Sequence, residues 1–144
     1  MLYILIAVYP KPLDLQQLLF LDYASVYSGD LGGPESLHTP VPLRGSEYTT
    51  RREVIEQGLF LMSTRGFVTV ILGQNGIEYC AGENAAAMLG IVSGNYAKKL
   101  RARCEWVAET LGSKSALDLQ QLFMREGFRW GAEFDLPAIE IIED

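Results

Sequence analysis

The sequence contains one histidine, His38, and Ser36 stands two residues before it. A serine and a histidine form a nucleophile and its base only when they share a hydrogen bond and a third group orients the imidazole. The sequence suggests no such third group, so we expect His38 to be a structural residue that packs within its loop. A small hydrolase with its site in this loop is the alternative hypothesis.

The two cysteines, Cys80 and Cys104, are the candidates for metal or redox chemistry. They are far apart in the sequence and have no neighbouring histidines, whereas zinc sites draw their ligands from closely spaced pairs. Free cysteines are among the most often buried residues, so we expect both in the core. The sequence also lacks a glycine-rich phosphate loop. We therefore expect no catalytic residue, no metal and no cofactor.

The composition is that of an ordinary globular domain, with 144 residues, 49% hydrophobic and 21% charged. The formal net charge of −6 disfavours general nucleic-acid binding, because phosphate contacts need a basic surface. The apolar stretch at residues 2–9 is far shorter than the roughly 20 residues that span a bilayer, and it lacks the flanking features of a secretory signal. We expect a cytoplasmic protein without membrane contact.

Two helices are predicted in the first part of the chain. The first covers residues 2–9 and ends before Pro10. Asp14 is a good N-cap for the second, which runs to about Tyr27. Its apolar residues have the spacing of a single stripe: Leu15, Leu18, Leu19, Tyr23 and Val26.

Asp22 falls within that apolar stripe. A carboxylate that is removed from water needs a charged or hydrogen-bonding partner. We therefore predict that Asp22 pairs with Arg51 or Arg52, as part of the structure and not as a catalytic acid.

A winged helix-turn-helix is the fold predicted for the middle of the chain. Glycines and prolines at residues 28–48 predict a long loop, and residues 51–65 predict a helix. The inner face of this helix should contain Val54, Ile55, Gly58, Leu61 and Met62. Two β-rich runs at residues 67–72 and 77–81 flank Asn75-Gly76, a strong hairpin signal. We predict a mainly α, α+β fold with a winged helix-turn-helix-like core, a β-hairpin wing and additional C-terminal helices.

The C-terminal helices are predicted at residues 83–92, at residues 94–111 and from about Asp118. The middle one has a clear core stripe: Ala97, Leu100, Cys104, Val107, Ala108 and Leu111. Residues 134–144 alternate in a way that suits an edge strand or a strand that binds a partner. We expect a winged-helix-like domain at residues 1–112, followed by a C-terminal helix and possible edge strand at residues 113–144.

The helix at residues 51–65 has one face that should point outward, with Glu53, Glu56 and Phe60. We assign these three residues to a partner-binding surface, because acidic side chains repel phosphate and an outward phenylalanine resembles the anchor of a protein interface. The alternative is that Phe60 packs on the first helix of its own chain.

The helix at residues 94–111 offers a second candidate surface. Trp106 lies opposite the core stripe, and Lys99 and Arg103 are beside it. A tryptophan flanked by cations suits a binding hot spot, so we assign these three residues to partner binding. The alternative is a helix that is buried on two sides.

Several motifs in one order resemble a known family, middle component two of bacterial ABC-three-component systems. The resemblance extends to about Gly112 and is carried by Pro12-Leu13-Asp14-Leu15, Leu21-Asp22-Tyr23, Ser28-Gly29-Asp30, Gly33-Pro34-Glu35-Ser36-Leu37-His38, Arg51-Arg52-Glu53, Gly58-Leu59, Asn75-Gly76-Ile77-Glu78-Tyr79 and Trp106-Val107.

This resemblance implies a small subunit that works with an SMC-like or Rad50-like ABC ATPase and an effector, as in Lamassu-type antiviral and antiplasmid defence. Such subunits look like adaptors, and the family has no catalytic residue to carry over. We therefore predict a non-catalytic adaptor whose contact with DNA is at most indirect or weak. The alternative is a winged-helix DNA-binding transcriptional regulator, which the acidic charge and the outward glutamates disfavour.

Overall fold

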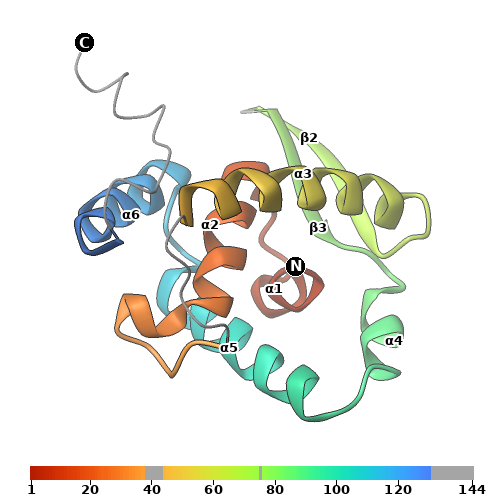
Figure 1. Ribbon diagram of the computed structural model, residues 1–144. Helices are drawn as coiled ribbons and strands as arrows, with labels where there is room; N and C mark the ends of the chain where they lie inside the picture. The colour runs from red at the N-terminus through yellow and green to blue at the C-terminus, as the bar shows by residue number, and fades with distance from the viewer. Residues whose placement is uncertain (38–43, 75, 131–144) are drawn as a thin grey trace.

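The computed structural model describes residues 1–37, 44–74 and 76–130, without the side chains of residues 30, 44–50 and 126–130. This part of the chain is mainly helical, with one small antiparallel sheet (Figure 1), so the predicted α+β class is confirmed. None of its helices is long and apolar enough to cross a membrane. The elements are α1 (Leu2–Val8), β1 (Leu13–Asp14), α2 (Leu15–Val26), η1 (Ser28–Leu31), α3 (Arg44–Ser63), β2 (Val68–Gly73), β3 (Gly76–Ala81), α4 (Ala85–Gly90), α5 (Asn95–Leu111) and α6 (Ala116–Trp130).

Helix α2 begins at a complete capping box. The Asp14 carboxylate accepts a hydrogen bond from the Gln17 backbone N–H at 2.7 Å, and the Gln17 side chain accepts one from the Asp14 N–H at 2.9 Å. This arrangement satisfies two backbone donors that have no partner within the helix. The predicted N-cap is therefore confirmed, and it fixes where α2 starts.

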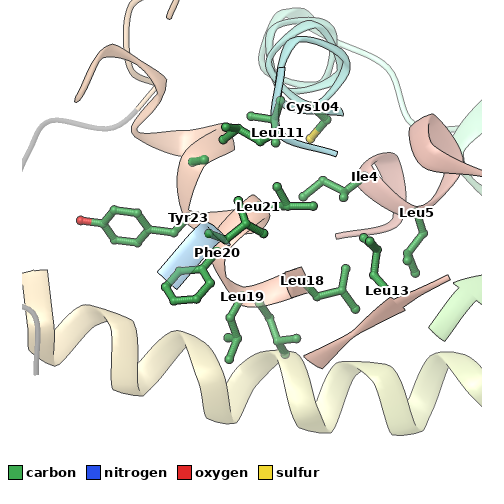
Figure 2. Close-up of a cluster of buried hydrophobic side chains, with 14 of the residues drawn as sticks. Ile4, Leu5, Leu13, Leu18, Leu19, Phe20, Leu21, Tyr23, Cys104 and Leu111 are labelled. Carbon is green, nitrogen blue, oxygen red and sulfur yellow. The ribbon is translucent and has the colours of Figure 1, made fainter. Parts of the chain in front are cut away.

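The hydrophobic core surrounds α2, which packs against α1, α3, α5 and α6. Figure 2 shows side chains of α1, α2 and α5 converging on one interior. The prediction of a single apolar stripe on α2 was wrong, because neighbours cover the helix on several sides. Its buried hydrophobic residues are Leu18, Leu19, Phe20, Leu21, Tyr23, Ala24 and Val26.

Helix α3 begins at Arg44, earlier than predicted, so the expected loop is shorter than residues 28–48. Among residues 51–63, whose side chains are described, the buried apolar residues are Ile55 and Leu59, whereas Val54 and Leu61 are exposed. The predicted inner face was wrong at Val54 and Leu61. Successive residues of a helix are about 100° apart around its axis. The buried face with Ile55 and Leu59 is therefore displaced to one side of the predicted face.

The sheet has the order β1-β3-β2 and is antiparallel throughout. The predicted hairpin is confirmed, with Leu72 opposite Ile77 and Gly73 opposite Gly76. β1 pairs with the other edge of β3 and places Leu13 opposite Tyr79. A strand of two residues is too short for a period-2 pattern, so the sequence did not predict it.

The C-terminal helices complete the core. Helix α5 has the predicted range, and Cys104, Val107 and Leu111 of its predicted stripe are buried. Helix α6 begins slightly before Asp118, whose backbone N–H donates to the Ser115 hydroxyl at 3.1 Å. Buried residues of α6 belong to the same cluster as those of α1, α2 and α5. The predicted edge strand at residues 134–144 lies outside the described residues.

Candidate interaction surfaces

Asp22 joins α2 to α3 through an ion pair. Its Oδ2 accepts a hydrogen bond from Arg51 Nε at 2.7 Å, and the Met1 amino group lies 3.4 Å from Oδ1. The side chains of Asp22 and Arg51 are only 15% and 19% exposed. The predicted pairing is therefore confirmed for Arg51. Arg52 instead pairs with Glu56 at 3.1 Å on the exposed surface of α3.

The segment after α2 is held by hydrogen bonds at both of its ends. The Ser28 hydroxyl donates to the carbonyl of Pro34 at 2.7 Å, and the Leu37 N–H donates to the carbonyl of Val26 at 2.9 Å. These bonds close residues 28–37 into a compact loop against the end of α2. The next residue, His38, lies outside the described residues, so its predicted structural role stays a prediction.

This loop also covers one side of α5. Arg103 Nε donates to the Glu35 carbonyl at 2.9 Å, and Trp106 packs so closely on Gly33 that a Cβ there would overlap the indole ring. Trp106 is partly buried against the core. Trp106 lies opposite the core stripe, as predicted, but residues of the loop cover that side, which favours the alternative of a helix buried on two sides. Lys99 is exposed, and the role of Lys99, Arg103 and Trp106 in partner binding stays a prediction.

The outer face of α3 is where the sequence predicted it. Glu53 and Glu56 are exposed, and Phe60 is 70% exposed. Phe60 therefore does not pack on the first helix of its own chain. An exposed phenylalanine in the last turn of α3, with Leu61 exposed beside it, leaves apolar surface that a partner can bury.

A second exposed apolar surface lies on the β-hairpin, and the sequence analysis did not identify it. Successive residues of a strand alternate between its faces, so Val70 and Leu72 of β2 share one face, and Ile77 is directly opposite Leu72. All three are exposed, and Leu72 is 82% exposed. The signal was present in the sequence, because the apolar alternation continues to the tip of the hairpin, beyond the buried Val68.

The residues with potential for nucleophilic or metal chemistry are placed differently. Burial of Cys104 raises the pKa of its thiol to about 11, which disfavours the reactive thiolate. Cys80 is buried in β3. Within the described residues no three His, Cys, Asp or Glu side chains come together as a metal-binding group. Exposed apolar side chains, such as those of α3 and the hairpin, are therefore better candidates for a functional surface than these reactive groups.

The described structure is thus that of a small, mainly helical α+β protein with exposed apolar side chains that include those of α3 and of a β-hairpin. A family model for Middle Component 2 of the ABC-three component (ABC-3C) system matches residues 1–133, and the chain belongs to this family. The match includes α6, beyond the residues to which the sequence resemblance extended. No curated protein and no solved structure matches the chain.

Proposed function

We propose that this chain is a non-catalytic adaptor that joins the ABC ATPase component of its system to an effector component. The observation that carries the proposal is the exposed apolar surface on α3 and the hairpin, in a chain that belongs to a middle-component family. Monomeric proteins rarely leave large contiguous apolar areas in water, and such areas mark interfaces. The partners of an adaptor in a multi-component system are the other components.

Phe60 is the proposed anchor on α3, and Leu72 is its counterpart on the hairpin. Aromatic residues often contribute most of the binding energy of an interface, while the charged residues around them exclude water and set specificity. Glu53 and Glu56 occupy that flanking position, so the partner surface should be basic at its margin. Burying a leucine as exposed as Leu72 would contribute about 1.5–3 kcal/mol.

The order of the elements supports the proposal that the fold is a winged helix. A short strand before α2 pairs with the last strand of a hairpin that follows α3 directly, and the sheet order is β1-β3-β2. We propose that α3 and the hairpin correspond to the recognition helix and the wing. In an adaptor this pair of elements would contact protein, such as an SMC-like or Rad50-like ATPase in a cytoplasmic conflict system.

Direct DNA recognition is the second candidate function, since winged helices commonly bind DNA through the same elements. Glu53 and Glu56 lie on the exposed face of α3, where they would repel phosphates. We therefore expect weak binding to random duplex DNA at physiological salt. A gel shift that shows tight binding with a steep salt dependence, lost in Lys99→Ala, would favour the DNA-binding regulator.

Co-expression with the ABC ATPase and effector components tests the adaptor function. The wild-type chain should co-purify with both, whereas Phe60→Ser and Leu72→Ser should each weaken the complex at least about tenfold, as truncating an interface anchor does. Ile91→Ser is the matched control, because Ile91 is 81% exposed but lies outside both surfaces. Unchanged affinity in both test variants, or failure of the wild-type chain to co-purify, would contradict the proposal.

A further inference from the structure

Strand β2 is an edge strand, and its outer edge has open hydrogen-bonding groups. The Gly82 N–H donates to the Phe67 carbonyl at 2.9 Å just beyond the strand ends. Hydrogen-bonded and non-hydrogen-bonded pairs alternate along an antiparallel ladder, so Val70 and Leu72 direct their N–H and C=O groups away from β3. Within the described residues no backbone hydrogen bond from these outer groups to another segment is present.

This edge lacks the features that normally protect an edge strand. Natural sheets block their edges with charged residues, prolines or bulges, because an open edge pairs with other chains. β2 has the sequence Val-Thr-Val-Ile-Leu-Gly, which contains neither a charge nor a proline, and its register with β3 is regular over its whole length. An uncharged strand of this kind is an aggregation hazard unless something covers it.

A cleft of about 420 Å³ lies beside the inner part of β2. Val68, Thr69 and Val70 line one side of it, and the other lining residues are Ser63, Gly66 and Glu83. Glu83 is exposed, also lines the neighbouring cleft near Thr69, and has no ion pair within the described residues. The approach to the edge is therefore apolar along the strand and acidic at its base.

We infer that β2 accepts an extended segment of a partner component as an added strand. This inference rests on the proposed adaptor function and specifies how the partner binds. Strand addition draws affinity from main-chain hydrogen bonds and specificity from alternate side chains. The incoming segment would carry apolar residues at alternate positions, facing Val70 and Leu72, and a lysine or arginine at the end that lies beside Glu83.

Charge favours a partner segment over a second copy of this chain. Each copy has a formal net charge of −6, and pairing two β2 edges would bring two acidic chains together. A basic, apolar segment instead complements both the uncharged strand and Glu83. The uncharged sequence of β2 is then explained by function, because a protective lysine on this edge would repel such a partner.

Residue-resolved hydrogen exchange tests this inference on the chain co-purified with its ABC ATPase and effector components. In the isolated chain the Val70 and Leu72 amides should exchange quickly, while Thr69 and Ile71 are already bonded to β3. In the complex, exchange at Val70 and Leu72 should slow by at least about tenfold, because a bonded amide exchanges only after opening. Exchange at Thr69 and Ile71 should change far less.

Two pairs of variants separate strand addition from other contacts at the same place. Val70→Pro removes the outward N–H but no bond to β3, so it should weaken the complex about tenfold, whereas Val70→Thr keeps the N–H and should bind normally. Glu83→Lys should also weaken the complex, and Glu109→Lys on the exposed part of α5 is its charge-matched control. Circular dichroism checks that each variant is folded.

Each alternative outcome overturns the inference in a recognisable way. A complex that forms while Val70 and Leu72 exchange as fast as in the isolated chain leaves the adaptor function standing and refutes strand addition. Slow exchange that appears in the isolated chain as its concentration rises assigns the edge to a second copy. If the components do not co-purify, the adaptor function fails and strand addition fails with it.

Discussion

Helix α2 and the β-hairpin are both rich in apolar residues, but the fold uses them in opposite ways. Helix α2 is surrounded by α1, α3, α5 and α6, so nearly its whole circumference is buried. The hairpin packs on the core through the buried Val68 and the partly buried Tyr79, and exposes Leu72 and Ile77 towards its tip. Apolar composition is thus compatible with a core element and with a surface element in the same chain.

The difference shows that burial is a property of the neighbours and not of the segment. Neighbouring helices surround α2, whereas part of the apolar hairpin face remains without a covering element in the described structure. Leaving aliphatic side chains in water forgoes stability, so a sequence that keeps them breaks a local rule of folding. Such violations are expected at functional sites, and here they coincide with the surface assigned to a partner.

Truncating the core beside α2 should have the largest effect on stability. Phe123 of α6 is fully buried, and its ring centroid lies 4.6 Å from that of Phe20. Phe123→Ala should lower the free energy of unfolding by about 3–5 kcal/mol, because it leaves a cavity. Denaturant titration measures this. Leu117→Ala on the exposed side of the same helix is the control, and equal losses in both would show that α6 does not belong to the core.

Breaking the ion pair between α2 and α3 should have the second-largest effect on stability. Asp22→Ala should lower the free energy of unfolding by about 2–3 kcal/mol, because the mutation removes a charge-assisted hydrogen bond from the poorly hydrated Arg51 guanidinium. Arg52→Ala removes an exposed pair and should change it by less than about 1 kcal/mol. Thermal melts of the two variants compare them directly. An Asp22→Ala protein as stable as the wild type would mean that the pair does not connect the two helices.

A methyl group added at Gly33, where the loop packs on α5, should have an intermediate effect on stability. Gly33→Ala places a methyl group against the Trp106 ring, and such overpacking commonly costs about 1–3 kcal/mol. Trp106→Phe shortens the ring, so the double variant should regain part of the loss. A Gly33→Ala protein with unchanged stability would indicate that the loop moves away from α5 at little cost.

The sequence predicted those features that depend on neighbours along the chain. The Asp14 cap, the hairpin at Gly73 and Gly76 and the range of α5 all follow from local hydrogen bonding and backbone geometry. The need of a poorly hydrated carboxylate for a charged partner also narrowed the partner of Asp22 to Arg51 or Arg52, and Arg51 is the one observed. The outward position of Phe60 was predicted from helical spacing alone.

Features that depend on contacts between distant segments could not be predicted in this way. Trp106 does lie opposite the core stripe of α5, but the loop from Ser28 to Leu37 returns to cover that side. Helical spacing describes one helix and carries no information about a second layer over it. The short strand β1 is defined by its pairing with β3, and β2 is an edge strand because of its place in the order β1-β3-β2. No pattern within either segment reveals these positions.

The buried thiol of α5 should make stability depend on alkaline pH. Burial raises the Cys104 pKa from 9.0 to about 11, so the folded protein disfavours the thiolate that the unfolded chain forms. The resulting stability is fully present below pH 9 and decreases as the pH rises towards 11. Between about pH 8 and pH 10 the wild type should lose about 1 kcal/mol more than Cys104→Ala does. Equal losses in the two proteins would contradict this.

The smallest effect on stability is expected at the hairpin tip and on the outer face of α3. Leu72→Ser and Phe60→Ser remove side chains that are already in water, so each should change the free energy of unfolding by less than about 0.5 kcal/mol. Denaturant titration under the conditions used for Phe123→Ala places all three on one scale. A loss of several kcal/mol in either serine variant would mean that the side chain is buried in solution, and the contrast between α2 and the exposed surface would then disappear. Near-normal stability together with loss of the partner complex is the combination that a binding surface requires, because the same side chains then act only in the assembly.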